Sequence, residues 1–341
     1  MLLILETTCD ETAAAVVDER LQVRGSSVAT QDALHQRFGG VVPEIASRAH
    51  VERVLPVIDE ALRKAEAKLG DISAVAVANT PGLAGSLLVG VAAAKTLALA
   101  LDVPLVAVNH VHAHIYACRV AAGEDVFPCV GFVVSGGHTT LFDCLSPLEF
   151  HVLGGTLDDA AGEAFDKTAS LLGLPYPGGP WIERTARGGD PTAFQFPRTF
   201  LKEDRLEFSF SGIKTAVRYA IAPQGSVPQG GAVEPPPAGS KLAADLAASF
   251  EQAMADTLVG KVEQALKRTK RTTLCVGGGV AANTRFRELL ATRMKRRNVK
   301  LHIAPRELCT DNAVMGAIAW ERLRAGLVES LELDVIPGLQ R

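Results

Sequence analysis

The sequence predicts an α/β protein built from two related lobes. Residues 2–5 and 13–17 are apolar runs on either side of a polar turn, a pattern typical of strand, turn, strand. Residues 129–134 and 139–145 repeat this plan around a turn of small residues. Two such hairpins, separated by alternating helical and strand patterns, indicate a duplicated architecture, although any α/β protein can contain two hairpins by chance.

Helices and strands alternate after the first hairpin. Apolar residues recur at three- and four-residue steps over 42–69, which predicts a helix that begins at Pro43. The apolar stretch 87–101 is interrupted by Lys95 and rich in small residues, so we expect a buried helix rather than a membrane span. The other elements expected in this half are a strand over 74–78, a Gly-rich turn over 80–86, a strand over 105–108 and a helix from His110.

The second half continues the alternation around one unusual segment. Residues 222–240 are rich in Pro and Gly and poor in apolar residues, so we expect a flexible loop between two helices. The elements expected around and after it are helices over 214–220 and 241–267, a strand over 274–276, a helix from about Ala281 and a last helix over 311–324.

Composition excludes several classes of protein. The net charge of −3 argues against a globally basic nucleic-acid-binding protein but leaves room for local basic patches. The six cysteines show no C-x-x-C pair and mostly lie in apolar runs, so they indicate reduced thiols in a reducing compartment. Residues 1–5 form an apolar run that is followed directly by Glu6 and has no basic region. This predicts a strand rather than a signal peptide, and a cytoplasmic protein without a membrane segment.

A pair of histidines is the first candidate for chemistry. His110 and His114 are four residues apart, so on a helix they share one face and can bind one metal ion, whereas His112 points elsewhere. Such pairs are also often plain core or surface residues. A zinc-protease interpretation needs a glutamate after the first histidine, and position 111 is valine.

Asp311 is the candidate third ligand. The run Thr310–Ala313 can simply cap the last helix through Thr310 or Asp311. Alternatively, the Asp311 carboxylate joins the two histidines, and two His with one carboxylate leave the open positions of a catalytic metal site.

Two Gly-rich turns are candidates for anion binding. Small residues over 133–139 and three glycines at 277–279 allow backbone N–H groups to approach a phosphate or nucleotide directly. Asn283 could then contact a base or ribose. A tight hairpin turn explains 133–139 equally well.

Charged residues supply two further candidates. One group consists of Glu163, Asp166 and Lys167, which are spaced to form ion pairs on an exposed helix face. Alternatively, a carboxylate of this group binds the hydroxyls of a ligand, with the loop 175–180 beside it. The basic runs 267–271 and 293–297 are solvated faces or phosphate contacts for a nucleic acid.

Taken in this order, with Glu6–Thr12 at the start, the motifs resemble the family of transferases that synthesise threonylcarbamoyladenosine in tRNA, formerly described as glycoproteases. The resemblance spans essentially the whole chain. It implies the two-lobed actin/sugar-kinase/Hsp70-like (ASKHA) fold with duplicated ribonuclease-H-like cores. We expect a first lobe over 1–117, completed by a C-terminal helix at about 311–330, and a second lobe over 118–310 that carries the flexible loop at 222–240.

The same resemblance implies the reaction. The enzyme would transfer the threonylcarbamoyl group from threonylcarbamoyl-AMP to the exocyclic amine of the adenosine beside the anticodon, in tRNAs that read codons starting with A. His110, His114 and Asp311 would hold one divalent ion, iron or zinc. Substrate-binding positions would be Val133, Val134, Ser135, Gly136, Gly137, Asp166, Gly179, Glu183 and Asn283. No general base is assigned; Asp10, Glu11 and His138 are candidates from chemistry alone.

Partners and alternatives complete the expectations. The resemblance implies a smaller paralogous subunit and a P-loop ATPase if the protein is bacterial. An ATP-dependent kinase or ATPase of the same fold is the main alternative, and a non-catalytic scaffold would be expected to lack the histidines. His112 stands where many members of the family have Glu, so the middle of that motif is not diagnostic.

Overall fold

The computed structural model describes residues 1–222 and 233–338, which form two compact units. The first unit comprises Met1–Phe127, Cys144–Phe150 and Ala304 onward, and the second comprises Pro128–Asp143 and His151–Ile303. Most of the loop predicted at 222–240 lies outside the described residues.

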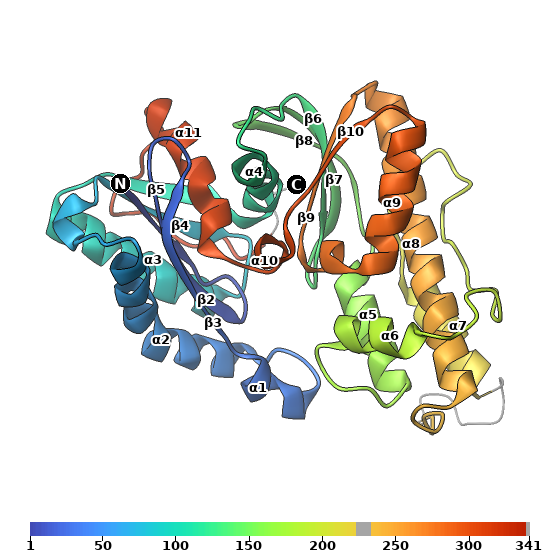
Figure 1. The fold of residues 1–341 in the computed structure, drawn as a ribbon. Coiled ribbons are helices and arrows are strands. Elements are labelled where there is room, and N and C mark those ends of the chain that lie inside the picture. The colour runs from blue at the N-terminus through green and yellow to red at the C-terminus, as the bar shows by residue number, and fades with distance from the viewer. Residues whose placement is uncertain (223–232, 339–341) are drawn as a thin grey trace. The chain divides into compact units, whose positions relative to one another are not determined.

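The first unit is built on a five-stranded sheet in the order β3-β2-β1-β4-β5 (Figure 1). β1 pairs antiparallel with β2 and parallel with β4, and β4 continues in parallel to β5. All five residues of β1 are buried, because helices cover both faces of the sheet. The strands are β1 (Leu2–Glu6), β2 (Glu11–Val17), β3 (Val23–Thr30), β4 (Ala74–Thr80) and β5 (Leu105–Asn109).

Helices α2 and α3 lie on one face of this sheet, and α4, η4 and α11 lie on the other (Figure 1). The helices of the unit are α1 (Asp32–His35), η1 (Gln36–Phe38), α2 (Pro43–Lys64), η2 (Leu69–Asp71), α3 (Ala84–Leu101), α4 (His110–Ala122), α10 (Arg306–Cys309), η4 (Ala313–Ile318) and α11 (Ala319–Arg324).

The second unit repeats the sheet of the first. Its strand order, β10-β9-β6-β7-β8, read backwards matches β3-β2-β1-β4-β5 read forwards, with each unit's first strand at the centre and its last two strands parallel beyond it. The duplication predicted from the two hairpins is therefore confirmed. The strands of this sheet are β6 (Cys129–Val134), β7 (Thr139–Ser146), β8 (Glu149–Gly155), β9 (Thr273–Gly277) and β10 (Lys300–Ile303), and the end of β7 and the start of β8 fall within Cys144–Phe150 of the first unit.

The helices of the second unit pack against this sheet and against one another, with the long α8 beside both α6 and α9. They are α5 (Ala161–Leu171), α6 (Gly178–Ala186), α7 (Ser211–Ile221), α8 (Lys241–Thr269), η3 (Gly279–Ala282) and α9 (Thr284–Arg296).

Three predicted helices have different bounds in the structure. The helix expected over 42–69 ends at Lys64. The helix expected from about Ala281 begins at Thr284, after the 3-10 turn η3. The last helix is divided into η4 and α11, and η4 packs against β1 at Gly316, where an added Cβ would lie 2.5 Å from the side chain of Ile4.

Helix α3 only partly matches the buried helix that was predicted. It has the length and mean hydropathy of a membrane span, but this is weak evidence because core helices share these properties. It packs on β4 and α2 with residues such as Leu87 and Val91 buried, while Leu88 and Leu99 on its outer side are exposed. The prediction therefore holds for one face of the helix only.

Candidate functional site

The paired histidines lie in the first two turns of α4, which begins directly after β5. The side chain of Asn109 caps this helix by accepting hydrogen bonds from the backbone N–H groups of Val111 and His112. The cap fixes the start of the helix, so His110 and His114 project from one face toward the segment that carries Asp311.

The structure brings His110, His114 and Asp311 together. Oδ1 of Asp311 lies 3.5 Å from Nε2 of His110 and 3.3 Å from Nε2 of His114. Ligand atoms that share an ion at about 2.1 Å, with roughly tetrahedral angles, are about 3.4 Å apart, so the observed distances suit a single metal ion.

His114 provides a separate test of the fit. Its side chain is fully buried; among the residues that the structure describes, Nδ1 has no hydrogen-bond partner, and Nε2 lies 3.3 Å from the Asp311 carboxylate without forming a hydrogen bond. A buried polar atom without a partner costs about 1–3 kcal/mol. A metal ion bound at Nε2 removes part of that cost, so the residues present fit such a group.

Glu6 and Thr8 hold the other side of the His110 ring. Oε2 of Glu6 lies 3.0 Å from Nδ1 of His110, and the Thr8 hydroxyl lies 3.1 Å from the same nitrogen. The second carboxylate oxygen of Glu6 accepts a hydrogen bond from the Thr8 backbone N–H at 2.7 Å. A carboxylate at Nδ1 favours a proton there, which leaves Nε2 with the lone pair that a metal requires.

The two carboxylates make this a site that attracts positive charge. Burial lowers the pKa of His110, but the charges of Asp311 and Glu6 outweigh burial and raise it to about 9. The protein therefore stabilises a buried cation between Glu6 and Asp311.

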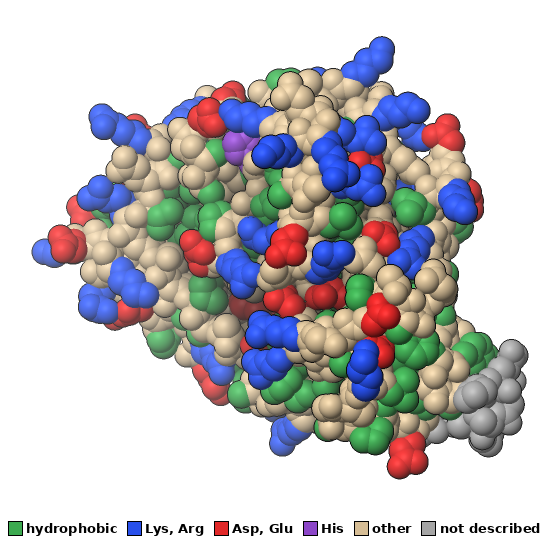
Figure 2. Space-filling view, turned by 45° about the vertical axis from the view of Figure 1, so that its right-hand side comes forward, with side chains coloured by type: hydrophobic (Ala, Val, Ile, Leu, Met, Phe, Trp, Pro, Cys, Tyr) green, Lys and Arg blue, Asp and Glu red, His purple; other side chains and the backbone are tan. Residues whose placement is uncertain are grey.

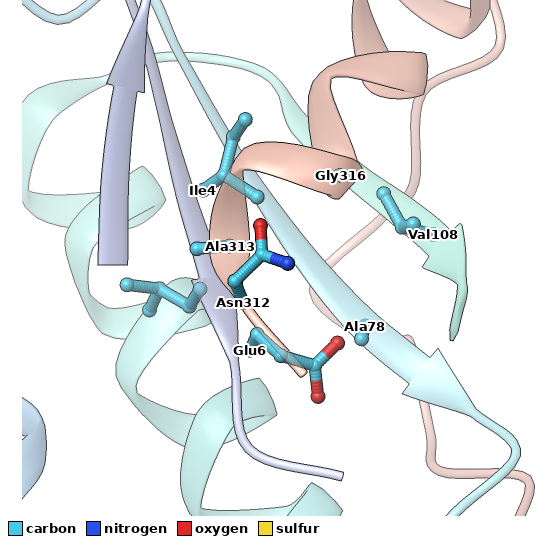
Figure 3. Close-up of a pocket in the computed structure, with 8 residues that line it drawn as sticks. Ile4, Glu6, Ala78, Val108, Asn312, Ala313 and Gly316 are labelled. Carbon is cyan, nitrogen blue, oxygen red and sulfur yellow. The ribbon is translucent and has the colours of Figure 1, made fainter. Parts of the chain in front are cut away.

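Asp311 is positioned by its neighbour Asn312. The Asn312 amide donates hydrogen bonds to the carbonyl oxygens of Leu308 and Thr310, and its Oδ1 accepts one from the backbone N–H of Met315 at the start of η4. The helix cap considered for Thr310 or Asp311 is therefore supplied by Asn312. Figure 3 shows Asn312 and Glu6 in a small crevice between η4 and the sheet.

His112 lies apart from this triad, as its position on the helix predicted. Its ring stacks on Phe150 with centroids 4.1 Å apart and planes inclined by 5°. Burial, with a smaller contribution from Arg322, lowers the pKa of His112 to about 4. His112 is thus a neutral packing residue at neutral pH.

The general-base candidates Asp10 and Glu11 form an acidic cluster with Asp32, a residue that sequence reasoning missed. Burial, then the charges of Asp311 and Asp10, raise the pKa of the Glu11 carboxyl well above its usual value.

A buried histidine supports the turn that carries these two acids. Nε2 of His50 lies 3.1 Å from the carbonyl oxygen of Cys9, and its Nδ1 lies 2.8 Å from the hydroxyl of Thr12 and 3.5 Å from the amide nitrogen of Gln31. A carbonyl can only accept, so His50 carries its proton on Nε2 and accepts at Nδ1. Its role depends on contacts between distant segments, and no sequence motif signals it.

In the second unit, residues 135–138 form a tight turn between β6 and β7. The backbone N–H of Ser135 donates to the carbonyl oxygen of His138 at 2.7 Å, and the His138 N–H donates to the Ser135 hydroxyl at 3.2 Å. The segment forms the tight turn that one interpretation predicted. The anion site predicted for the same segment stays a prediction, and the Ser135 N–H is already used within the turn. Val133 and Val134 are buried strand residues.

Several glycines allow the surrounding segments to approach this turn. An added Cβ at Gly162, at the start of α5, would lie 2.7 Å from Cα of Gly136, and one at Gly278, which has φ of +100°, would lie 2.4 Å from the carbonyl oxygen of Val134. By contrast, an added Cβ at Gly136, Gly137 or Gly179 meets nothing within 4 Å. These three glycines therefore border open space in which a ligand could contact the backbone.

Asp166 joins α5 to the start of α6. Its Oδ1 accepts a hydrogen bond from the Gly178 N–H at 2.7 Å, next to Gly179. The neighbouring Lys167 forms ion pairs with Asp159 at 2.6 Å and Glu163 at 2.8 Å. The ion-pair interpretation thus holds for Glu163 and Lys167, while Asp166 fixes the loop around Gly179.

Asn283 caps α9 and is itself held by two acids. Its Oδ1 accepts from the Phe286 N–H at 2.9 Å, and its amide nitrogen lies 2.7 Å from Oε1 of Glu251 and 3.4 Å from Oε2 of Glu183. Glu183 also accepts from the N–H and hydroxyl of Thr284. Sequence reasoning missed Glu251, because it lies within the long α8 in no recognisable motif.

Comparison with known proteins gives strong matches over the whole chain. A family model described as tRNA N6-adenosine threonylcarbamoyltransferase matches residues 22–318. A protein of that name from Rhodopirellula baltica is 51% identical over 352 residues, which cover 100% of this chain and 97% of the relative. Another from Moorella thermoacetica is 47% identical over 339 residues, with coverages of 99% and 96%.

Solved structures show the same fold at low sequence identity. Full-length HypF has a TM-score of 0.60 at 14% identity, covering 96% of this chain and 47% of its own. The activator of 2-hydroxyisocaproyl-CoA dehydratase from Clostridium difficile has a TM-score of 0.54 at 12% identity, covering 98% of each chain. A ROK family glucokinase from Streptomyces griseus has a TM-score of 0.50 at 12% identity, covering 94% of this chain and 98% of its own. Together these matches confirm the predicted ASKHA fold.

Proposed function

The chain belongs to the tRNA N6-adenosine threonylcarbamoyltransferase family, and from this premise we propose how its residues perform the transfer. The enzyme is an acyltransferase that attaches a threonylcarbamoyl group to the N6 nitrogen of an adenosine in tRNA. Phosphorylation or ATP hydrolysis, the alternative for this fold, is not favoured by these relatives.

We propose threonylcarbamoyl-AMP as the donor and the adenosine beside the anticodon, in tRNAs that read codons starting with A, as the acceptor. The N6 amine attacks the carbamoyl carbonyl, the bond from that carbon to the phosphate oxygen breaks, and AMP leaves. A proton must leave the amine during this step. Because the amine is a weak nucleophile, much of the rate would come from positioning.

The second unit would bind the AMP portion. The open space beside Gly136, Gly137 and Gly179 supports this assignment. The N–H groups of Gly136 and Gly137 would stabilise negative charge on the departing phosphate, since that of Ser135 is engaged within its turn. Asp166 and Asn283 would border the nucleotide, with Glu183 beside Asn283.

The first unit would hold one iron or zinc ion through His110, His114 and Asp311. The single observation that supports it best is the buried His114 ring without a hydrogen-bond partner, 3.3 Å from Asp311. When bound, such an ion supplies Lewis acidity toward substrate oxygens. Glu6 would keep the His110 ring in the tautomer that binds metal.

Glu11 is the best general-base candidate of the three. A carboxyl whose pKa is raised by burial and neighbouring carboxylates accepts a proton more readily near neutral pH than an ordinary glutamate. Asp10 and His138 are alternative candidates for the general base. Asp10 belongs to the same acidic cluster as Glu11, and His138 directly follows Gly137 in the turn proposed to bind the phosphate.

For partners, we propose tRNA as the macromolecular substrate, with a smaller paralogous subunit and a P-loop ATPase as further components in a bacterial host. We also propose a cytoplasmic location. Five of the six cysteines are buried, as expected for thiols of the core, which agrees with a reducing compartment.

The pathway assignment is tested by depleting the protein in its host and measuring the nucleosides of digested tRNA by mass spectrometry. Selective loss of threonylcarbamoyladenosine is expected. Unchanged levels after confirmed depletion would contradict the proposal.

The metal assignment is tested with purified protein. His110→Ala should abolish both metal binding and transfer, while His112→Ala, a change of the same residue type on the same helix, should retain the metal. Full transfer activity in His110→Ala would rule out the metal role.

A further inference from the structure

Two basic runs of the sequence meet at one end of the second unit. Strands β9 and β10 are parallel, and α9 connects them, so α9 must end beside the residues where both strands begin. Helix α8 ends at Thr269, just before β9 begins at Thr273. The C-terminal ends of α8 and α9 therefore lie at the same edge of the sheet.

Specific contacts join these two ends. Arg297, after the end of α9, forms an ion pair with Glu263 of α8 at 2.8 Å. The backbone N–H of Lys300 donates to the carbonyl oxygen of Thr272 at 2.8 Å, and Lys300 is paired with Thr273 in the sheet. The two basic runs are thus side by side, although they are far apart in the sequence.

Ion pairing divides the basic residues of this region into two groups. Arg268 pairs with Asp204 and Arg271 pairs with Asp143, as Arg297 does with Glu263. Five others are exposed and form no ion pair with any residue that the structure describes. We call these five the basic end: Lys267, Lys270, Arg293, Lys295 and Arg296.

Helix-dipole stabilisation explains only part of this arrangement. A cation in the last turn of a helix contributes about 0.3–1 kcal/mol, which accounts for one or two such residues on each helix. It does not explain why two helix ends that carry unpaired cations are adjacent, because their mutual repulsion offsets the gain. In the space-filling view of Figure 2, Lys and Arg side chains gather over the upper part of the surface, with fewer acidic side chains among them.

The basic end is too far from the Gly-rich turns to serve a bound nucleotide. The turn at Gly277–Asn283 lies at the opposite end of β9, whose five residues span about 16 Å at about 3.3 Å each. Helix α9, with 13 residues, separates Asn283 from Arg296 by about 20 Å. A ligand that reaches both places must be a long polyanion.

We propose that the basic end binds the ribose-phosphate backbone of the tRNA substrate, away from the adenosine that is modified. The inference rests on the proposed function, which supplies tRNA as the polyanion. Flexible Lys and Arg side chains that lack acidic partners provide sequence-independent phosphate contacts. They would thus add affinity for the whole tRNA without taking part in the chemistry.

The test compares two triple variants of the full chain. Arg293→Ala/Lys295→Ala/Arg296→Ala removes three charges from the basic end, and alanine preserves the helix. Arg20→Ala/Arg24→Ala/Lys68→Ala removes three exposed charges from the first unit as a control. Unmodified tRNA is titrated against each protein over a range of salt concentrations.

The basic-end variant should bind tRNA about tenfold or more weakly than wild type near 0.1 M salt. Its plot of log affinity against log salt should be shallower by about 0.7–0.9 for each phosphate that the variant no longer neutralises. With partner subunits present, its KM for tRNA should rise while kcat at saturating tRNA and the affinity for AMP stay unchanged. The control variant should match wild type in all of these.

Two outcomes would overturn the inference. One is a basic-end variant with the tRNA affinity and salt dependence of the control. Another is a loss of binding to phosphatidylserine vesicles with tRNA affinity unchanged, which would assign the surface to a membrane. If the wild-type protein itself modifies no tRNA, the proposed function fails first, so the two failures are distinguishable.

Discussion

Glu6 and Asp311 contact opposite edges of the His110 ring, with Oε2 of Glu6 3.0 Å from Nδ1 and Oδ1 of Asp311 3.5 Å from Nε2. The first contact sets the tautomer of the ring, and the second lies on the side proposed for the metal. Glu6 is the last residue of β1 and His110 is the first residue of α4. The end of the first strand therefore fixes the orientation of the His110 ring.

Glu6→Gln should weaken metal binding by about 10–100-fold, the usual effect of removing a carboxylate behind a ligand histidine. The variant keeps only one acceptor oxygen, so it cannot serve both the Thr8 N–H and Nδ1 of His110 as Glu6 does. Metal titration in a competing chelator measures the change. Glu66→Gln, at an exposed position with the same change of charge, is the control, and equal affinities in the two variants would argue against this role.

The two histidines should respond differently when stability is measured in metal-free protein. His114→Leu removes a buried ring that forms no hydrogen bond and whose contact with Asp311 is 3.3 Å long, so the free energy of unfolding should be unchanged or higher. His110→Leu leaves the Glu6 carboxylate buried without that partner, so it should destabilise the protein by about 3 kcal/mol. Urea denaturation of both variants after chelation decides the matter. Equal losses would mean that His114 has a structural partner and is not kept for metal.

Acid should weaken the first unit through His50. Burial lowers the pKa of His50; the Cys9 carbonyl, Glu6 and Asp10 oppose this effect, and Arg53 adds to it. A histidine whose folded pKa lies below its unfolded value of about 6.5 contributes stability above that pH, which is lost as the pH falls toward the folded pKa. The neutral Thr12 and Gln31 side chains accept no proton in this range.

His50→Gln keeps a donor and an acceptor but does not titrate. The difference in unfolding free energy between wild type and this variant should therefore be larger at pH 7 than at pH 5. Denaturant titrations at the two pH values provide the measurement. A difference that is constant with pH would show that the pKa of His50 is the same in the folded and unfolded protein.

The sequence predicted most of the fold but only part of each site. The hairpins and the four-residue spacing of His110 and His114 are local patterns, and short segments determine them. Glu6 and His50 depend on pairing between segments 104 and 41 residues apart, which periodicity does not encode. Asn283 is predicted as a nucleotide contact from its place after three glycines, but its partner Glu251 is determined only when α8 packs beside α9.

Glu251 should act on nucleotide binding through Asn283. The Glu251 carboxylate accepts a buried hydrogen bond from the Asn283 amide. Burial raises the pKa of Glu251, and this hydrogen bond lowers it. Oδ1 of Asn283 caps α9, and the amide nitrogen of Asn283 donates to Glu251. The two contacts together fix the orientation of the Asn283 side chain. Glu251→Ala should therefore weaken AMP binding, although Glu251 lies behind the residue proposed to border the nucleotide.

Three variants separate orientation from helix capping. Glu251→Gln can still present an oxygen to the Asn283 amide, so it should restore most of the AMP affinity that Glu251→Ala removes. Asn283→Ser keeps the cap but loses the amide that donates to Glu251, so it should bind AMP weakly, whereas Asn283→Ala should be less stable than Asn283→Ser by about 1 kcal/mol because it also loses the cap. Isothermal titration with AMP and urea denaturation measure the two effects. If Asn283→Ser binds AMP as wild type does, Asn283 serves α9 alone, and the orienting role of Glu251 has no ligand to act on.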